Sequence, residues 1–154
     1  MAYDISVKEI APERIVSARG RYRTAQLSLV APRELARVVT ALLAQKAEPI
    51  GGAVARYHGW NDETVEVELG YPARGDFASV EGGVVESTLP GGKVVFAKHV
   101  GPYDEIATAY QAVMDYAEAE DIRLADTMWE RYITDPTCEP DQSKYVTEIY
   151  WPVA

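Results

Sequence analysis

The chain has 154 residues, of which 47% are hydrophobic and 25% are charged, a composition that suits one globular domain with a buried core. Its formal net charge of −9 argues against a nucleic-acid-binding surface, because phosphate contacts need clustered Lys and Arg. No apolar run approaches the roughly 20 residues that span a bilayer, and the N-terminus has no secretion signal. We therefore expect a cytoplasmic protein with no membrane partner.

The sequence carries no metal or nucleophile motif. Cys138 is the only cysteine, which excludes an internal disulfide and a thiolate metal cluster. His58 and His99 are far apart and lack the spacing of metal ligands. There is neither a Ser-His-Asp order nor a Gly-rich phosphate loop after a strand. These features predict no metal and no cofactor.

The first half of the chain predicts four strands and one helix. Residues 4–10 and 14–19 are predicted strands, and each is followed by a Pro or Gly that stops it. Residues 32–47 repeat apolar side chains at helical spacing, and the proline at their start suits a first helical turn. Residues 53–58 and 64–72 predict two further strands, the second with strict alternation.

The second half repeats this order after a linker rich in Gly, Ala and Asp at residues 73–83. Its elements are strands at 84–88 and 93–98 joined as a hairpin, a helix at 103–120, and strands at 128–133 and 144–153.

The two halves share the same order of strands and helix, which indicates a duplication. When residues 64–72 are aligned with the final strand, Glu68 and Glu148 occupy equivalent positions. Two such units, each too small to bury a face alone, are expected to pack together. The sequence therefore predicts an α+β fold, in which duplicated βαββ units form an antiparallel sheet with two helices on one face and pseudo-two-fold symmetry. The predicted halves are about 1–75 and 84–154 of a single domain over residues 1–154.

Alternation in the final strand separates two faces. Glu148 and Tyr150 point to one side, whereas Ile149 and Trp151 point to the other, which we expect to face the helices. A carboxylate in an apolar, aromatic strand is costly unless a cation or a hydrogen-bond donor meets it. Glu148 is therefore the predicted centre of a ligand site.

The strand at 128–133 adds further candidates. Glu130 and Tyr132 share one side of it, and we expect Tyr132 to lie beside Glu148. Trp129 is expected in the core, with the helix-facing residues. The predicted ligand-binding set is Glu148, Glu130, Tyr132, Tyr150, Tyr110 on the second helix and Trp60 at the rim.

Each acid also has a purely structural interpretation. Glu148 could be an exposed strand carboxylate or the partner of a basic residue such as Arg131, and Glu130 could be a salt-bridged surface acid. A carboxylate among aromatic rings, by contrast, suits weakly hydrated cations, which gain about 0.5–2 kcal/mol from each cation–π contact. These residues predict a small aromatic or cationic ligand.

Three segments resemble the GyrI-like small-molecule-binding family: Gly101–Glu105 opening a helix, Trp129–Pro136, and Thr147–Val153. The same domain forms the effector-binding half of bacterial multidrug-responsive transcription regulators. The resemblance covers essentially the whole chain and implies two βαββ units with a ligand groove between them. It also implies that an acid at the position of Glu148 meets lipophilic cations among aromatic side chains.

The resemblance leaves three functions open. The first is a stand-alone, multidrug-type binder of lipophilic cations, since no DNA-binding helices precede the domain and no direct nucleic-acid binding is expected. The second is a hydrolase of strained, cyclopropanoid electrophiles, in which Glu148 would be the catalytic Glu and Tyr132, or else Tyr110, the catalytic Tyr. The third is an interaction protein like the family members that inhibit a topoisomerase. We favour the binder, because Arg131 nearby can hold Glu148 ionised.

Overall fold

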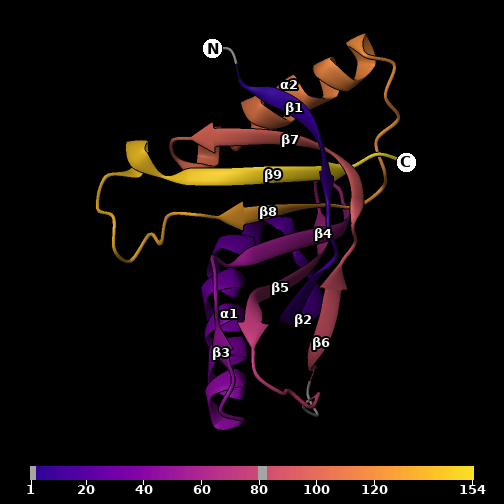
Figure 1. Cartoon of the computed structure of the whole chain (residues 1–154). Coiled ribbons are helices and arrows are strands. Elements are labelled where there is room, and N and C mark those ends of the chain that lie inside the picture. The colour runs from indigo at the N-terminus through magenta and orange to yellow at the C-terminus, as the bar shows by residue number, and fades with distance from the viewer. Residues whose placement is uncertain (1–2, 80–82) are drawn as a thin grey trace. The chain divides into compact units, whose positions relative to one another are not determined.

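The computed structural model describes residues 3–79 and 83–154, which form two compact units (Figure 1). The first unit joins Met1–Ala11 to Gly91–Ala154, and the second is Pro12–Pro90. Residues 80–82, near the end of the predicted linker, lie outside the described residues. Within the described residues each unit contains an antiparallel sheet and one α-helix, which confirms the α+β class.

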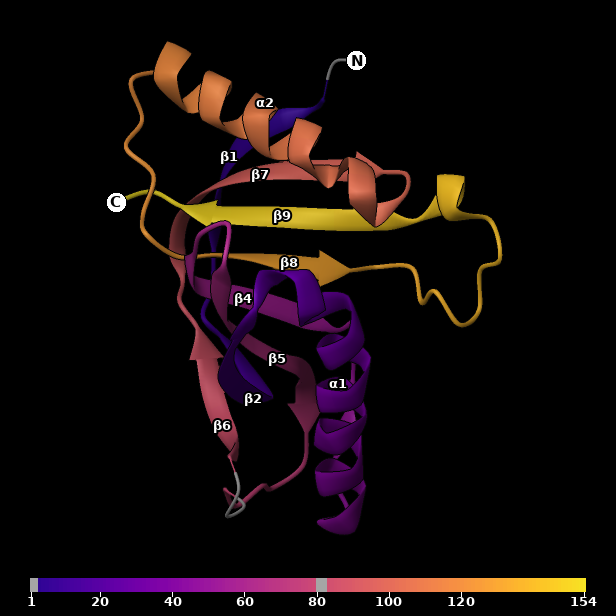
Figure 2. The same ribbon diagram turned by 180° about the vertical axis from the view of Figure 1, so that it is seen from behind.

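The sheet of the first unit has the strand order β1-β7-β9-β8, and the final strand of the chain lies inside it. Helix α2 follows a short 3-10 turn and runs along this sheet beside β7 (Figure 2). The elements are β1 (Ile5–Ile10), β7 (Gly92–Val100), η2 (Tyr103–Glu105), α2 (Ile106–Ala119), β8 (Met128–Tyr132), η3 (Gln142–Lys144) and β9 (Val146–Pro152).

The sheet of the second unit has the order β4-β5-β2-β6, and the short β3 also pairs with β5. Helix α1 packs its buried side chains, Val38 and Leu42, against Val16 and Ala18 of the sheet. The elements are β2 (Glu13–Arg23), η1 (Thr24–Gln26), α1 (Leu27–Ala44), β3 (Glu48–Pro49), β4 (Val54–Trp60), β5 (Thr64–Arg74) and β6 (Val84–Leu89).

Helix α1 begins earlier than the predicted start at residue 32. It runs over Leu27–Ala44, so Pro32 lies inside the helix rather than in its first turn. A proline lacks the N–H that would bond to the carbonyl four residues before it. The earlier start adds a turn that buries Val30, which lies before the proline and is 7% exposed, and burial of this apolar side chain favours the helix.

The predicted hairpin of residues 84–88 and 93–98 is wrong. β6 pairs with β2, and β7 pairs with β1, so the two strands on either side of the Gly-containing turn belong to different units. The first strand of each repeat thus completes the sheet that the other repeat provides. The Gly-rich composition of residues 89–92 predicts a turn, but it does not determine which strands pair. Each strand pairs with the sheet edge that is available to it, and that edge is formed by distant segments.

Matched registers show the duplication. In both units the mid-strand glutamate has a basic residue as its cross-strand partner on either side. These trios are Arg19–Glu68–Arg56 in the second unit and Lys98–Glu148–Arg131 in the first. Positions of the two units can therefore be compared residue by residue. No helix within residues 3–79 and 83–154 is long and apolar enough to cross a membrane.

Gly70 on β5 is a position where any side chain is expected to destabilise the sheet. A Cβ there would lie 2.1 Å from the carbonyl oxygen of Val16 and 2.7 Å from Ser17 Cβ. We expect Gly70→Ala to lower the free energy of unfolding by about 2 kcal/mol or more, because overpacking forces the strands apart. Urea denaturation measures this change. Gly59→Ala, which meets no heavy atom within 4 Å, is the matched control, and equal losses in both variants would contradict the expectation.

Candidate functional site

The four predicted site residues of β8 and β9 form two acid–tyrosine pairs. The Tyr132 hydroxyl donates to Glu130 Oε1 over 2.6 Å. The Tyr150 hydroxyl donates to Glu148 Oε1 over 2.8 Å. In each pair the two residues are separated by one position of the same strand, which puts both side chains on one face of the sheet. The structure therefore brings each acid together with a tyrosine of its own strand.

The register of β8 on β9 places these pairs on opposite faces. Glu130 lies opposite Ile149, and Arg131 lies opposite Glu148. Directly opposed residues in antiparallel strands share a face. Glu130 therefore shares the face of Ile149 and Trp151, which is the face covered by α2. Glu148 lies on the opposite face.

The Trp151 ring contacts the ring of Tyr110 on α2, with centroids 6.4 Å apart, which identifies the α2 side of the sheet. Tyr132, opposite Thr147, is on this side as well. The expectation that Tyr132 lies beside Glu148 is wrong. An offset of one residue between β8 and β9 decides which side chains of β8 share the face of Glu148.

Trp129 lies on the face of Glu148, not with the helix-facing residues as expected. It is opposite Tyr150, and the two rings stack with centroids 5.7 Å apart and an interplanar angle of 12°. Phe96 on β7 meets the Tyr150 ring from the other side at 5.2 Å. Burial, followed by the hydrogen bond to Glu148, raises the pKa of Tyr150 to about 12. This face is an aromatic ladder across three strands.

Among the described residues, Glu130 is a buried carboxyl with a single hydrogen bond. Its side chain is buried, with 5% exposure, and burial raises its pKa to about 7 although the hydrogen bond from Tyr132 acts to lower it. Within residues 3–79 and 83–154 it makes no ion pair. A buried carboxylate with one hydrogen bond and no cation is an unfavourable arrangement unless a ligand completes it.

Aromatic rings gather around Tyr132, the hydrogen-bond partner of Glu130. Tyr103 of η2 packs edge-on against Tyr132, with centroids 5.5 Å apart, and is tilted against Tyr145, with centroids 5.1 Å apart. The pKa of Tyr103 is raised by burial first, and then by Tyr145, Asp135 and Glu130. Neither Tyr103 nor Tyr145 was among the predicted site residues. Extending the alternation of β9 by one position would have placed Tyr145 on the face of Thr147.

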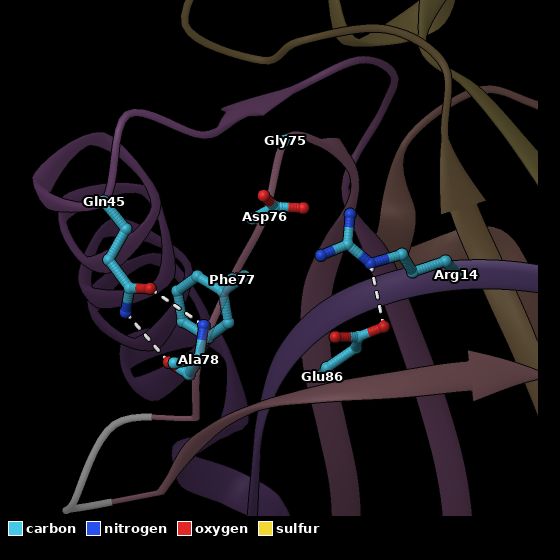
Figure 3. Close-up of a pocket in the computed structure, with 7 residues that line it drawn as sticks. All are labelled: Arg14, Gln45, Gly75, Asp76, Phe77, Ala78 and Glu86. Carbon is cyan, nitrogen blue, oxygen red and sulfur yellow. Dashed lines mark hydrogen bonds and ion pairs between the residues drawn. The ribbon is translucent and has the colours of Figure 1, made fainter.

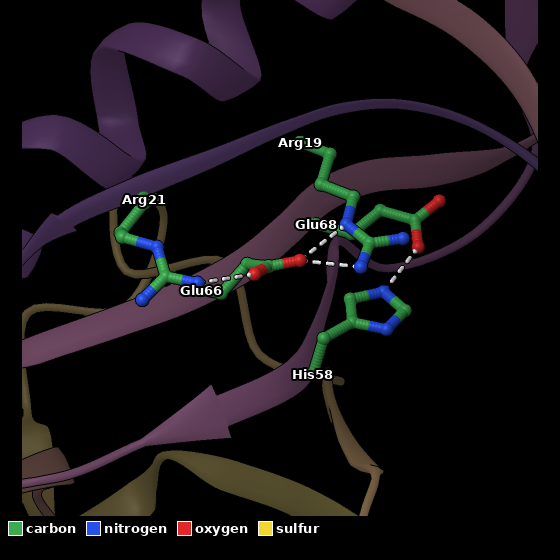
Figure 4. Close-up of polar contacts among 5 residues, drawn as sticks. All are labelled: Arg19, Arg21, His58, Glu66 and Glu68. Atoms are coloured by element: carbon green, nitrogen blue, oxygen red, sulfur yellow. Dashed lines mark hydrogen bonds and ion pairs between the residues drawn. The ribbon is translucent and has the colours of Figure 1, made fainter.

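Glu68 in the second unit is a buried glutamate whose carboxylate oxygens both have hydrogen-bond partners. It is 4% exposed, Ser17 Oγ donates to its Oε2 over 2.6 Å, and His58 Nε2 lies 2.9 Å from its Oε1 (Figure 4). Burial acts to raise the pKa of Glu68, but hydrogen bonds from Ser17, Ser87 and His58 together outweigh burial and hold the pKa below its ordinary value. Glu68 is stabilised by its neighbours, unlike Glu130.

Comparison of matched positions singles out Glu130. Leu69 and Ile149 each follow the matched glutamate of their strand, and their partners on the neighbouring strand are Ala55 and Glu130. Ala55 is 1% exposed, so the second unit has an apolar core residue where the first has an acid. A buried acid in place of a core alanine lowers stability, which favours a functional role for Glu130.

The other two predicted residues, Tyr110 and Trp60, make ring contacts within their own units. Tyr110 packs on Trp151 and belongs to the contact between α2 and its sheet. Trp60 lies at the end of β4 in the second unit, where it is 48% exposed and meets the Tyr57 ring edge-on at 6.5 Å.

A surface hollow of about 720 Å³ in the second unit contains none of the predicted residues (Figure 3). Two of its charged groups are paired with each other, since Arg14 Nε donates to Glu86 Oε1 over 3.0 Å. Gln45 exchanges two hydrogen bonds with the backbone of Ala78 at its rim. Among the described residues, the hollow contains no buried acid and none of the aromatic residues predicted for the site, so Glu130 with Tyr132 is the stronger candidate site. The lining residues are Arg14, Gln45, Gly75, Asp76, Phe77, Ala78 and Glu86.

Solved structures with a similar fold include three of interest. The C-terminal domain of EcmrR has a TM-score of 0.81 and 23% identity, with 100% of this chain and 99% of that chain covered. SAV2435 bound to tetraphenylphosphonium has a TM-score of 0.69 and 16% identity, covering 100% and 94%. A hydrolase encoded by lin2189 from Listeria innocua has a TM-score of 0.65 and 13% identity, covering 97% and 91%. At these identities the likeness shows a shared fold alone.

Comparison with protein-family models assigns the chain to a family, which the similar structures alone do not. No curated protein matches the sequence. The family described as GyrI-like small molecule binding domain matches residues 3–154, nearly the whole chain. Because this match covers nearly the whole chain and the structure has the expected α+β fold, the chain belongs to the GyrI-like small-molecule-binding domain family.

Proposed function

We propose that this protein binds lipophilic organic cations and that Glu130 is the carboxylate that meets the positive charge. One observation carries the proposal. Glu130 is buried beside Tyr132, whose ring packs against Tyr103, yet within the described residues it has a single hydrogen bond and no cationic partner. A bound cation supplies the charge that lets this carboxyl ionise.

The physical gain is specific to weakly hydrated cations. Such an ion loses little hydration on entering an apolar site, and each aromatic face adds about 0.5–2 kcal/mol. A neutral or anionic ligand gains no electrostatic attraction from ionised Glu130. Stacking and charge tolerate many molecular shapes, so a broad, multidrug-type selection of ligands follows from this chemistry.

Glu130 suits this role better than Glu148, the acid first expected at the centre. Glu148 has Lys98 and Arg131 as its cross-strand partners, so protein cations already flank it. The guanidinium of Arg131 also lies 5.9 Å from the centroid of the Tyr150 ring, where an aromatic ring would otherwise receive a ligand cation. Glu130 has no such competitors in the described part of the chain.

One solved structure of similar fold points the same way. SAV2435 was solved with tetraphenylphosphonium, a lipophilic cation without hydrogen-bond donors. Its identity to this chain is 16%, so the ligand is carried over here as a proposal, supported by the environment of Glu130.

The test compares Glu130→Gln with Glu148→Gln, since each removes one charge from a glutamate held by a tyrosine. Titration calorimetry with tetraphenylphosphonium at pH 8 is expected to show a loss of affinity of about tenfold or more in Glu130→Gln, the equivalent of one charge-assisted contact. Glu148→Gln is expected to bind within about twofold of wild type. Circular dichroism checks that both variants are folded.

Two outcomes count against the proposal. If wild type and Glu130→Gln bind tetraphenylphosphonium equally, Glu130 is not the cation partner. A loss confined to Glu148→Gln would return the role to the other face of the sheet.

A hydrolase is the second candidate, because a carboxyl with a pKa of about 7 suits a general base near neutral pH. Glu130 would take a proton from water as the water oxygen attacks a strained ring carbon, and Tyr132 would protonate the leaving atom. Mass spectrometry of epoxide- or cyclopropane-bearing compounds incubated with the protein separates the two functions. A binder returns them intact, whereas many turnovers to a water-added product, abolished in Glu130→Gln, would replace the binding proposal.

A further inference from the structure

Thr147 on β9 carries the one polar atom beside Glu130 that nothing satisfies in the described part of the chain. The side chain is 0% exposed, and its Oγ1 has no hydrogen-bond partner among these residues. Thr147 lies opposite Tyr132 and diagonally from Glu130, on the same face of the sheet. Diagonal neighbours in antiparallel strands are about 7–8 Å apart, a span that one small ligand can bridge.

The polar neighbours of Thr147 are already engaged. His99, opposite Thr147 on β7, donates from Nε2 to the carbonyl oxygen of Pro102 over 3.0 Å. The other ring nitrogen of His99 contacts the Tyr3 hydroxyl at 3.3 Å. The Tyr132 hydroxyl is donated to Glu130. The Thr147 hydroxyl is therefore left to interact with something that residues 3–79 and 83–154 do not supply.

Matched positions add an independent observation. Thr147 immediately precedes Glu148, as Val67 precedes Glu68, and Val67 is 0% exposed and apolar. Together with Glu130 in place of Ala55, this makes two polar residues in the first unit where the second has apolar core residues. Both departures fall on the α2 side of adjacent strands, so they point to one polar ligand feature.

We propose that Thr147 is a specificity-determining contact, which gives the site a preference for cations that carry an N–H group, such as protonated amines, over quaternary cations. This inference rests on the proposed function, because it takes Glu130 as the partner of the positive charge. An ammonium N–H can donate to Thr147 Oγ1 while its charge faces Glu130. A quaternary cation satisfies the carboxylate and leaves the buried hydroxyl without a partner.

The test uses two probes that differ only at nitrogen: protonated 3,3-diphenylpropylamine and its N,N,N-trimethyl derivative. Titration calorimetry at pH 8 measures both affinities in wild type, Thr147→Val and Thr147→Ser. The Val variant keeps the shape and loses the hydroxyl, and the Ser variant keeps the hydroxyl. We expect Thr147→Val to weaken the primary ammonium about tenfold, or about 1.4 kcal/mol, and to leave the quaternary probe within about twofold. Thr147→Ser is expected to retain the wild-type ratio of the two affinities.

Failure of this inference is distinguishable from failure of the proposed function. If Thr147→Val changes neither probe, or weakens both equally, Thr147 does not read the N–H group and the inference falls. If Glu130→Gln leaves both probes unaffected, the proposed function itself falls. A Thr147→Ser variant that behaves like Thr147→Val would also overturn the role of the hydroxyl.

Discussion

Glu130→Gln is expected to be more stable than wild type above pH 7, by about 3 kcal/mol. The pKa of Glu130 is raised from 4.5 to about 7 in the folded protein, so the folded state holds its proton more tightly than the unfolded state. Wild type is therefore most stable, with respect to this group, below about pH 4.5. That contribution is lost as the pH rises through about 7, where the buried carboxyl must ionise. The Gln variant stays neutral throughout.

Urea denaturation between pH 4.5 and 8.5 measures this difference. The stability of wild type should fall relative to that of Glu130→Gln across the window and then level off. Glu148→Gln serves as the control, because Glu148 lies between two basic cross-strand partners and gains nothing from neutralisation. Parallel curves for wild type and Glu130→Gln would show that Glu130 is not a strained, buried acid.

Glu68→Ala is expected to have the opposite effect, a loss of about 3 kcal/mol at neutral pH, because it breaks a buried network and leaves its donors unpaired. Ser17 and His58 would lose their shared acceptor. The pKa of Glu68 is lowered on folding, so its contribution is present above the unfolded value of 4.5 and disappears as the pH falls through the lower folded value. The gap between wild type and Glu68→Ala should therefore narrow in acid.

Chemical denaturation at pH 7 and pH 3 tests this prediction. Glu66→Ala is the matched control, since Glu66 lies on the same strand and pairs with Arg19 and Arg21 near the surface (Figure 4). Its removal should cost only a small fraction of the loss in Glu68→Ala. Equal losses in the two variants, or a gap that does not change with pH, would contradict the account of the Glu68 network.

The opposite signs expected for these variants follow in large part from the hydrogen bonds. Glu130 and Glu68 are 5% and 4% exposed, so burial penalises both charges. Glu68 receives hydrogen bonds from three side chains, whereas Glu130 receives one. The difference separates a carboxylate that stabilises the fold from one that is kept for a ligand.

Local pattern determined the larger part of the fold. The alternation of residues 64–72 predicted β5 and its buried face, and the alignment of Glu68 with Glu148 predicted units whose registers do match. These features could be read because side-chain period and duplication are properties of the chain itself. The partners of β6 and β7 could not, because both belong to sheets formed by distant segments.

The candidate site was predicted in its residues but not in its geometry. Sequence alone determined that acids and tyrosines lie on adjacent strands, and that within each strand Glu130 goes with Tyr132 and Glu148 with Tyr150. Only the tertiary structure decided that these two pairs are on opposite faces. Each strand has a period of two that its sequence reveals, but the loop between Tyr132 and Val146 leaves the offset between the two strands free. Cross-strand hydrogen bonds set that offset, and one residue of register decides which acid is buried.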